Sequence, residues 1–165
     1  QKVTPAARLS LSGGANIQHW KEVLFYGNFS LSNQIIQRSQ GKSAVAAAAY
    51  RSGEKLVNEW DGLTHDYTRK GGVVHTEIML PSHAPPEFAD RSTLWNSVEQ
   101  IEKSSTPSCQ EIEVALPVEL SRAEQLALVR SFVQDNFVSA GMCADFAIHD
   151  KGTGNPHAHI LLTIR

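Results

Sequence analysis

The 165-residue chain is 41% hydrophobic and 19% charged, a composition that is typical of a folded globular domain and excludes a disordered or fibrous protein. Its formal net charge of −2 excludes a globally basic nucleic-acid-binding domain, so contact with a polyanion would need a local basic patch or a metal ion. The two cysteines have no zinc-site spacing and no apolar run approaches membrane-spanning length, so we expect a cytoplasmic protein without membrane insertion.

The N-terminal third of the chain is expected to form one strand and one helix. From Asn28, the stretch NFSLSNQIIQRS alternates polar and apolar residues, which predicts a strand. The alanine-rich segment 43–56, SAVAAAAYRSGEKL, has high helix propensity. Ser43 is placed to cap this helix, and Gly53 is expected to end or loosen it.

The middle of the chain contains a predicted loop, two strands and a helix. Residues 57–72 are polar and are expected to form a loop, and VVHTEIMLP then predicts a strand that Pro81 stops. After Asp90, apolar residues recur at helical spacing. CQEIEVALP predicts a third strand, with Glu111 and Glu113 together on one of its faces.

The last third of the chain carries a predicted helix and a predicted hairpin. A capping box from Ser121 to Glu124 opens an amphipathic helix that closes at Gly141. The segments MCADFAIHD and HAHILLTIR, joined by the loop KGTGNP, are interpreted as the two strands of a hairpin. About five strands and three helices, segregated along the chain, indicate an α+β fold with helices against one face of a sheet.

Two histidines of the last strand are the first candidates for a functional site. His157 and His159 share a face of an extended segment, whereas Ala158 and Ile160 point into the core. The preceding strand carries His149, which the hairpin should place opposite His157 or one pair away. Three neutral imidazoles suit a divalent transition metal, so this cluster is a candidate metal site.

A carboxylate is a plausible further ligand. Glu111 is the best candidate, followed by Glu113 and Glu77. The alternative is that the paired histidines are simply exposed residues of a strand without a metal. The remaining histidines show no comparable geometry and are interpreted as surface residues: His19, His65, His75 and His83.

Five motifs in register resemble the MobA/MobL (MobQ-class) plasmid mobilisation relaxases, which belong to the HUH endonuclease superfamily. The motifs are QGKSAVAAAAYRSGEKL, HTEIMLP, QEIEVALPVEL, GMCADFAIHD and NPHAHILLT. The resemblance runs from about residue 28 to residue 165. It implies a five-stranded antiparallel sheet flanked by α-helices, with a metal ion, most simply Mg²⁺ or Mn²⁺, and one catalytic tyrosine.

The resemblance also implies roles for individual residues. Relaxases of this family cut one DNA strand at the nic site of an origin of transfer and stay attached to its 5′ end. By motif, Tyr50 corresponds to the nucleophile and His149, His157 and His159 to the metal site. Glu111 corresponds to an additional ligand or another active-site carboxylate.

Several assignments stay open at the level of sequence. Tyr67 and Tyr26 are rival nucleophiles, and the base that would accept the tyrosine proton could be Glu77, Glu111, Asp66 or the metal ion itself. A free tyrosine hydroxyl has a pKa near 10, so the site must favour the charged form. Side chains near these tyrosines are candidate DNA contacts: Arg51, Lys55, Arg69, Lys70, Trp60 and Tyr67.

We interpret residues 1–22 as a peripheral extension and residues 23–165 as a catalytic core from a longer protein. The expected partners are single-stranded DNA at an origin of transfer and accessory mobilisation and coupling proteins. A rolling-circle replication initiator would use the same chemistry on a different DNA target. A metal-binding or DNA-binding module without catalysis is the alternative from another class.

Overall fold

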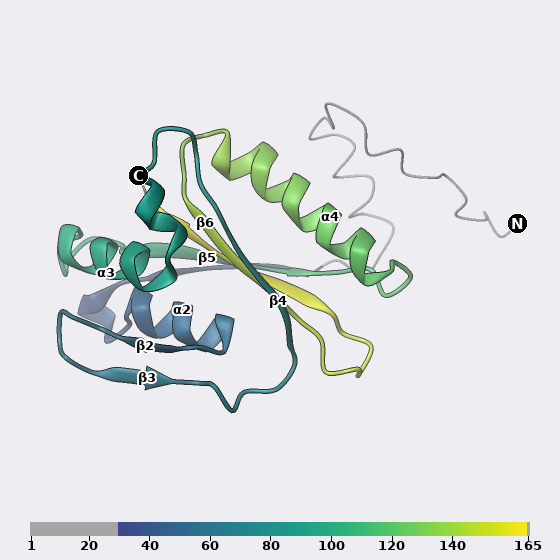
Figure 1. Cartoon of the computed structure of the whole chain (residues 1–165), viewed down its shortest axis with the longest axis horizontal. Helices are drawn as coiled ribbons and strands as arrows, with labels where there is room; N and C mark the ends of the chain where they lie inside the picture. Colours follow the sequence, from purple (N-terminus) through teal and green to yellow (C-terminus); the bar gives the residue numbers. More distant parts are fainter. Residues whose placement is uncertain (1–29, 165) are drawn as a thin grey trace, which may run out of the picture.

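The computed structural model describes residues 30–164, so the extension at residues 1–22 and Tyr26 lie outside the described part. The core of the molecule is a five-stranded sheet in which every neighbouring pair is antiparallel (Figure 1). In order across the sheet, its strands are β1 (Leu31–Ile36), β5 (Cys109–Ala115), β7 (His157–Thr163), β6 (Ala144–His149) and β4 (Val73–Met79). This is the α+β sheet that the sequence predicted.

The first helix, α2 (Ala44–Ser52), is shorter than the predicted segment. Ser43 caps it as expected, because its side chain accepts a hydrogen bond from the Ala46 N–H at 3.2 Å. Gly53 ends it in the left-handed conformation, with φ of 70°, which costs glycine little. Tyr50 and Arg51 therefore lie in the last turn of α2.

The predicted loop at 57–72 is partly wrong, because a small hairpin forms there. Strands β2 (Lys55–Val57) and β3 (Thr64–Asp66) pair antiparallel and make a separate two-stranded sheet. Their connection is tight, since the Asn58 N–H donates to the Leu63 carbonyl at 2.8 Å. Short 3₁₀ turns lie elsewhere in the fold, at η1 (Arg38–Gln40) and η2 (Pro86–Ala89).

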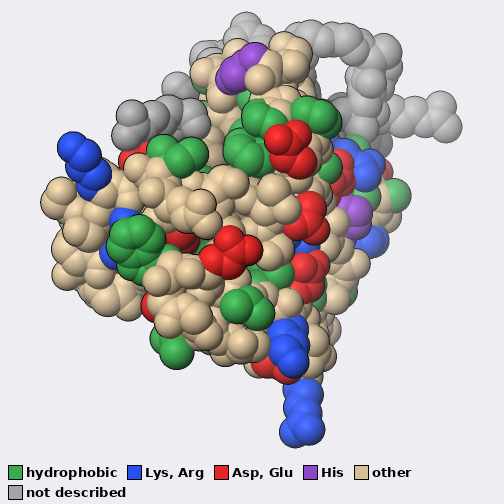
Figure 2. Space-filling view, turned by 60° about the vertical axis from the view of Figure 1, so that its left-hand side comes forward, with side chains coloured by type: hydrophobic (Ala, Val, Ile, Leu, Met, Phe, Trp, Pro, Cys, Tyr) green, Lys and Arg blue, Asp and Glu red, His purple; other side chains and the backbone are tan. Residues whose placement is uncertain are grey.

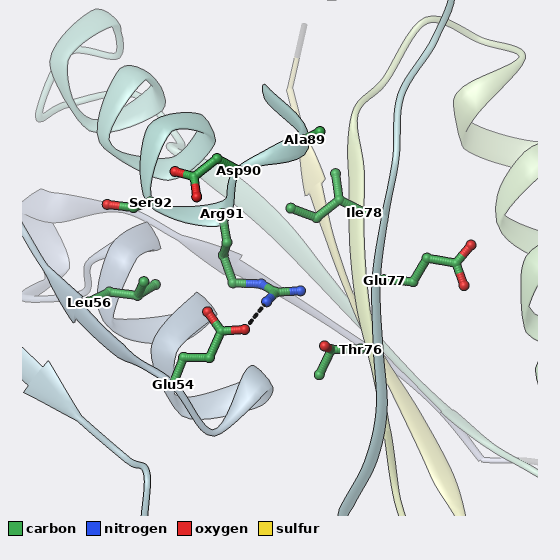
Figure 3. A pocket seen from close by; sticks show the side chains of 9 residues that line it. All are labelled: Glu54, Leu56, Thr76, Glu77, Ile78, Ala89, Asp90, Arg91 and Ser92. Atoms are coloured by element: carbon green, nitrogen blue, oxygen red, sulfur yellow. Dashed lines mark hydrogen bonds and ion pairs between the residues drawn. The ribbon is translucent and has the colours of Figure 1, made fainter. Parts of the chain in front are cut away.

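The second helix, α3 (Arg91–Ile101), is fixed to the sheet by a buried ion pair. Arg91 donates two hydrogen bonds of 2.8 Å to the two carboxylate oxygens of Asp145, and its third nitrogen contacts Glu54 (Figure 3). The indole N–H of Trp95 donates to the same Asp145 at 2.8 Å. A cavity of about 350 Å³ lies beside this pair, against β4. Because its ionised groups are already paired with each other, we assign this cluster a structural role.

The third helix, α4 (Arg122–Val133), begins with the predicted capping box. Ser121 accepts a hydrogen bond from the Glu124 N–H, and the Glu124 side chain accepts one from the Ser121 N–H. The helix continues into a π-helical turn, η3 (Gln134–Val138), and the chain then turns at Gly141, where φ is 96°.

Helices cover both faces of the sheet, so the prediction of helices against one face is wrong. Figure 1 shows α4 on one side of the sheet and α2 with α3 on the other. Two apolar clusters result, one under α4 that includes Phe146 and Ile160, and one under α2 and α3 that includes Trp95 and Leu161. The physical reason is that the central strands present buried side chains on both faces; every residue of β6 is buried.

Candidate metal centre and active site

The β6–β7 hairpin brings three histidines together. Its register places His149 directly opposite His157, as predicted, and His159 opposite Ala147. The ring centroids of His149 and His159 are 4.7 Å apart, and the centroids of His157 and His159 are 4.9 Å apart. One nitrogen from each ring lies within 4.8 Å of the others, which is a spacing that could hold a metal ion.

Each imidazole uses one ring nitrogen to contact an oxygen atom of the protein. His149 Nε2 lies 2.6 Å from the Arg51 carbonyl, and His157 Nδ1 lies 2.9 Å from the Asn155 carbonyl. His159 Nδ1 lies 2.9 Å from Glu111 Oε1. An oxygen acceptor holds the proton on the nitrogen that faces it, so each neutral ring keeps its other nitrogen as a lone-pair donor. The donor set therefore fits a divalent metal ion.

The surroundings keep two of these imidazoles neutral. Burial lowers the pKa of His149 to about 4, and the nearby Lys70, His159 and His157 act in the same direction against the hydrogen bond to Arg51. Burial also lowers the pKa of His159, helped by Arg51 and opposed by Glu111. A neutral imidazole is the form that binds a metal.

Glu111 is buried and contacts His159 of the histidine cluster and the neighbouring Arg51. Burial by itself would raise the pKa of Glu111, but hydrogen bonds from His159 and Arg51 outweigh burial and hold the pKa at about 2. Gln34 donates a further hydrogen bond to Glu111 at 2.6 Å. The ionised carboxylate thus connects the ring of His159 to the guanidinium of Arg51, which lies 2.5 Å away.

The two other predicted carboxylates are placed differently. Glu113 is half-exposed, and its Oε2 atom lies 3.9 Å from His159 Nδ1. Glu77 lies on the other face of the sheet, where it pairs with Arg130 of α4 at 2.8 Å. It points away from Arg91 and Glu54 across β4 (Figure 3). Glu77 is therefore not brought to the histidine cluster, because the strand alternation puts it on the α4 side.

Tyr50 shares a cavity with the three histidines. This cavity has a volume of about 300 Å³, and Tyr50, His149, His157 and His159 all line it. The hydrogen bond between His149 and the Arg51 carbonyl ties the last turn of α2 to the cluster. Tyr50 is 43% exposed, so the residue is open to solvent.

The predicted DNA contacts divide into a group at the cavity and a group on the outer surface. At the cavity, Lys70 and Arg51 are lining residues, and Arg51 is paired with Glu111. Tyr67 packs edge-on against the Tyr50 ring, with centroids 5.0 Å apart. Lys55, Arg69 and Trp60 are exposed. The guanidinium carbon of Arg38 lies 4.3 Å from the centroid of the Trp60 ring. Seen from the side of α3, acidic side chains lie across the middle of the surface and basic ones at its margins (Figure 2).

Sequence reasoning missed four residues that line the cavity, namely Gly71, Lys151, Thr153 and Asn155. Lys151, Thr153 and Asn155 all come from the loop between β6 and β7. The signal that could have found them is their position, because a loop that joins two histidine-bearing strands must lie beside the histidines.

The comparisons with known proteins identify the family. The family model described as MobA/MobL family matches residues 42–165, which is most of the chain. This chain belongs to the MobA/MobL family. Among curated relatives, a conjugal transfer protein TraA of Rhizobium radiobacter is 41% identical over 145 residues, covering 81% of this chain and 13% of the relative.

Two further similarities support the MobA/MobL assignment. A mobilization protein MobL of Acidithiobacillus ferridurans is 38% identical, covering 82% of this chain and 42% of the relative. A solved structure described as the molecular basis of vancomycin resistance transfer in Staphylococcus aureus superposes with a TM-score of 0.80 at 31% identity. The superposition covers 84% of this chain and 71% of the chain in the solved structure. This chain thus spans a minor part of the curated relatives, about an eighth of TraA and less than half of MobL.

Among residues 30–164, no helix combines the length and the apolar character that a membrane crossing requires.

Proposed function

We propose that this MobA/MobL chain is the catalytic core of a relaxase, which nicks one DNA strand at the origin of transfer of a plasmid in a metal-dependent reaction. The observation that carries this proposal is that an accessible tyrosine and three histidines with free ring nitrogens line one cavity. Names of relatives that refer to conjugal transfer and mobilisation support the choice of target.

The proposed metal ligands follow from the ring contacts. His149 would use Nδ1, and His157 and His159 would use Nε2, because the other nitrogen of each ring faces an oxygen of the protein. A divalent ion such as Mg²⁺ or Mn²⁺, when bound there, supplies positive charge to the non-bridging oxygens of the scissile phosphate. Glu111 would act by fixing the ring of His159 rather than as a ligand.

Tyr50 is the proposed nucleophile. Its hydroxyl oxygen forms a bond to phosphorus while the bond from phosphorus to the 3′ oxygen breaks. The phenol gives up its proton to water at the exposed edge of the cavity, and the leaving 3′ oxygen takes up a proton from water. The product is a 5′-phosphotyrosyl link, and one phosphate ester replaces another. The step is therefore a reversible transesterification that needs no nucleotide cofactor.

The test is covalent capture of DNA. The protein is incubated with Mn²⁺ and a single-stranded oligonucleotide that carries its cognate nic site, and the adduct is resolved by denaturing electrophoresis. We expect an adduct with the wild type and with Tyr67→Phe, and none with Tyr50→Phe. An adduct that survives Tyr50→Phe but is lost in Tyr67→Phe would move the nucleophile to Tyr67. No adduct with any variant would favour a module without catalysis.

The histidines are tested separately from DNA binding. We expect His157→Ala to abolish cleavage while single-stranded DNA binding stays within about twofold of the wild type, because the ring's proposed role is to hold the ion. A parallel loss of binding would contradict a purely catalytic role. Cleavage of a replication origin in preference to an origin of transfer would favour a rolling-circle initiator. We also propose accessory mobilisation and coupling proteins as partners.

A further inference from the structure

The turn after β3 is tied to the end of α2. The Tyr67 N–H donates to the Glu54 carbonyl at 3.1 Å, and the Lys70 N–H donates to the Tyr67 carbonyl at 2.9 Å. Asp66 closes the start of the turn by accepting from both the N–H and the hydroxyl of Thr68. These bonds fix where the side chains of Tyr67 and Lys70 can reach.

Both side chains contact the ring of Tyr50. Tyr67 packs against it edge-on, with an interplanar angle of 86°. The Lys70 ammonium lies 3.6 Å from the ring centroid, and it donates a hydrogen bond of 2.7 Å to the Tyr50 carbonyl. The carbonyl therefore anchors the ammonium over the face of the same residue's ring. Lys70 also lines the cavity that contains the three histidines.

We propose that Lys70 is a positioning residue that holds the Tyr50 ring and stabilises the negative charge that the phenol develops as it attacks phosphorus. This inference rests on the proposed function. A cation over an aromatic face is attracted by the electron density of the ring. Phenolate places more negative charge in the ring than phenol does, so the attraction favours the charged form.

The charges around Lys70 are consistent with this role. Burial, Arg51 and Lys151 together lower the pKa of Lys70 to about 8, and Glu111 opposes them. Lys70 in turn contributes to the lowered pKa of His149, which lines the same cavity. The Lys70 ammonium is in contact with a carbonyl and an aromatic ring.

Chemical nitration of tyrosine tests the inference without DNA. Tetranitromethane is uncharged and reacts with phenolate, and peptide mapping separates the three tyrosines of the chain. At pH 7 we expect Lys70→Met to slow nitration of Tyr50 about two- to fivefold, because this is the effect expected when a cation–π contact at a half-exposed ring is lost. Lys70→Arg should restore the rate. Lys103→Met, a change at an exposed lysine after α3, is the matched control and should leave the rate unchanged.

The opposite outcomes overturn the inference. If Lys70 only packs against the ring, Lys70→Met exposes Tyr50 and its nitration becomes faster. An unchanged rate shows that the ammonium has no influence on the phenol. The oligonucleotide assay supplies the second readout, in which Lys70→Met should slow adduct formation at pH 7 and Lys70→Arg should recover it. Because nitration needs no cleavage, a wild type that forms no adduct refutes the proposed function alone.

Discussion

The two faces of the central sheet differ in what their buried side chains do. Along β7, Ala158, Ile160 and Leu162 pack under α4 in an apolar cluster. The intervening His157 and His159 belong to the opposite face, where they line the cavity with Tyr50. One step along the strand therefore separates a side chain that stabilises the fold from one that serves the site.

The faces also differ in how burial is stabilised. Under α4, removal of apolar area from water is favourable by itself. On the other face, ionisable groups are buried, and each needs a specific partner to offset the loss of hydration. Glu111 is satisfied by His159 and Arg51, and Asp145 by Arg91 and Trp95. Apolar burial contributes to stability on both faces, and the histidine face in addition carries the paired ionisable groups of the site.

The largest expected effect comes from a change on the α4 face. Phe146 is fully buried there, so Phe146→Ala should lower the free energy of unfolding by about 3–5 kcal/mol. Its folded fraction should still bind Mn²⁺. His157→Ala should instead lose Mn²⁺ affinity, while its free energy of unfolding changes by less than about 1 kcal/mol. Urea unfolding and calorimetric Mn²⁺ titration measure the two quantities. Loss of Mn²⁺ binding by folded Phe146→Ala protein would show that the faces are coupled.

The pH dependence of stability should come from the histidine face. His149 has a pKa of about 4 when folded, below its ordinary value of 6.5, so folding favours the neutral ring. Its contribution is fully present above pH 6.5 and is lost as the pH falls toward 4, up to about 3 kcal/mol without metal.

Unfolding by urea at pH 7.5, 6, 5 and 4 in chelator measures this dependence. His149→Gln should flatten the curve. Phe146→Ala should lower the curve by a similar amount at every pH, because no ionisable group is lost. A His149→Gln curve as steep as that of the wild type would assign the acid sensitivity to other groups.

The parts that the sequence predicts well depend on local pattern. Alternation and capping motifs located the strands of the main sheet and the start of α4, and the hairpin register followed from the short loop between His149 and His157. The five motifs of the family supplied Tyr50, which its alanine-rich context alone does not distinguish from a packing residue.

The parts that the sequence missed depend on tertiary contacts. Strands β2 and β3 have three residues each, too few to show alternation. Helices cover both faces because β6 buries Phe146 on one side and Ala147 and Asp145 on the other, and no local pattern states which helix covers which side. Glu77 is a lower-ranked candidate carboxylate from its sequence, and its pairing with Arg130 depends on the position of α4.

The smallest expected effect tests whether the histidine face needs its supporting carboxylate. Glu111→Gln keeps the shape of the side chain but removes the charge that fixes the His159 ring, so Mn²⁺ affinity should fall about 10- to 100-fold. Glu113→Gln is the matched control, because Glu113 lies on the same strand face but is 46% exposed and 3.9 Å from His159. Its effect on calorimetric Mn²⁺ affinity should stay below about twofold, as expected for a screened charge. A larger loss in Glu113→Gln than in Glu111→Gln would make Glu113 the ligand. The site would then take its carboxylate from the half-exposed rim rather than from the buried pair with Arg51.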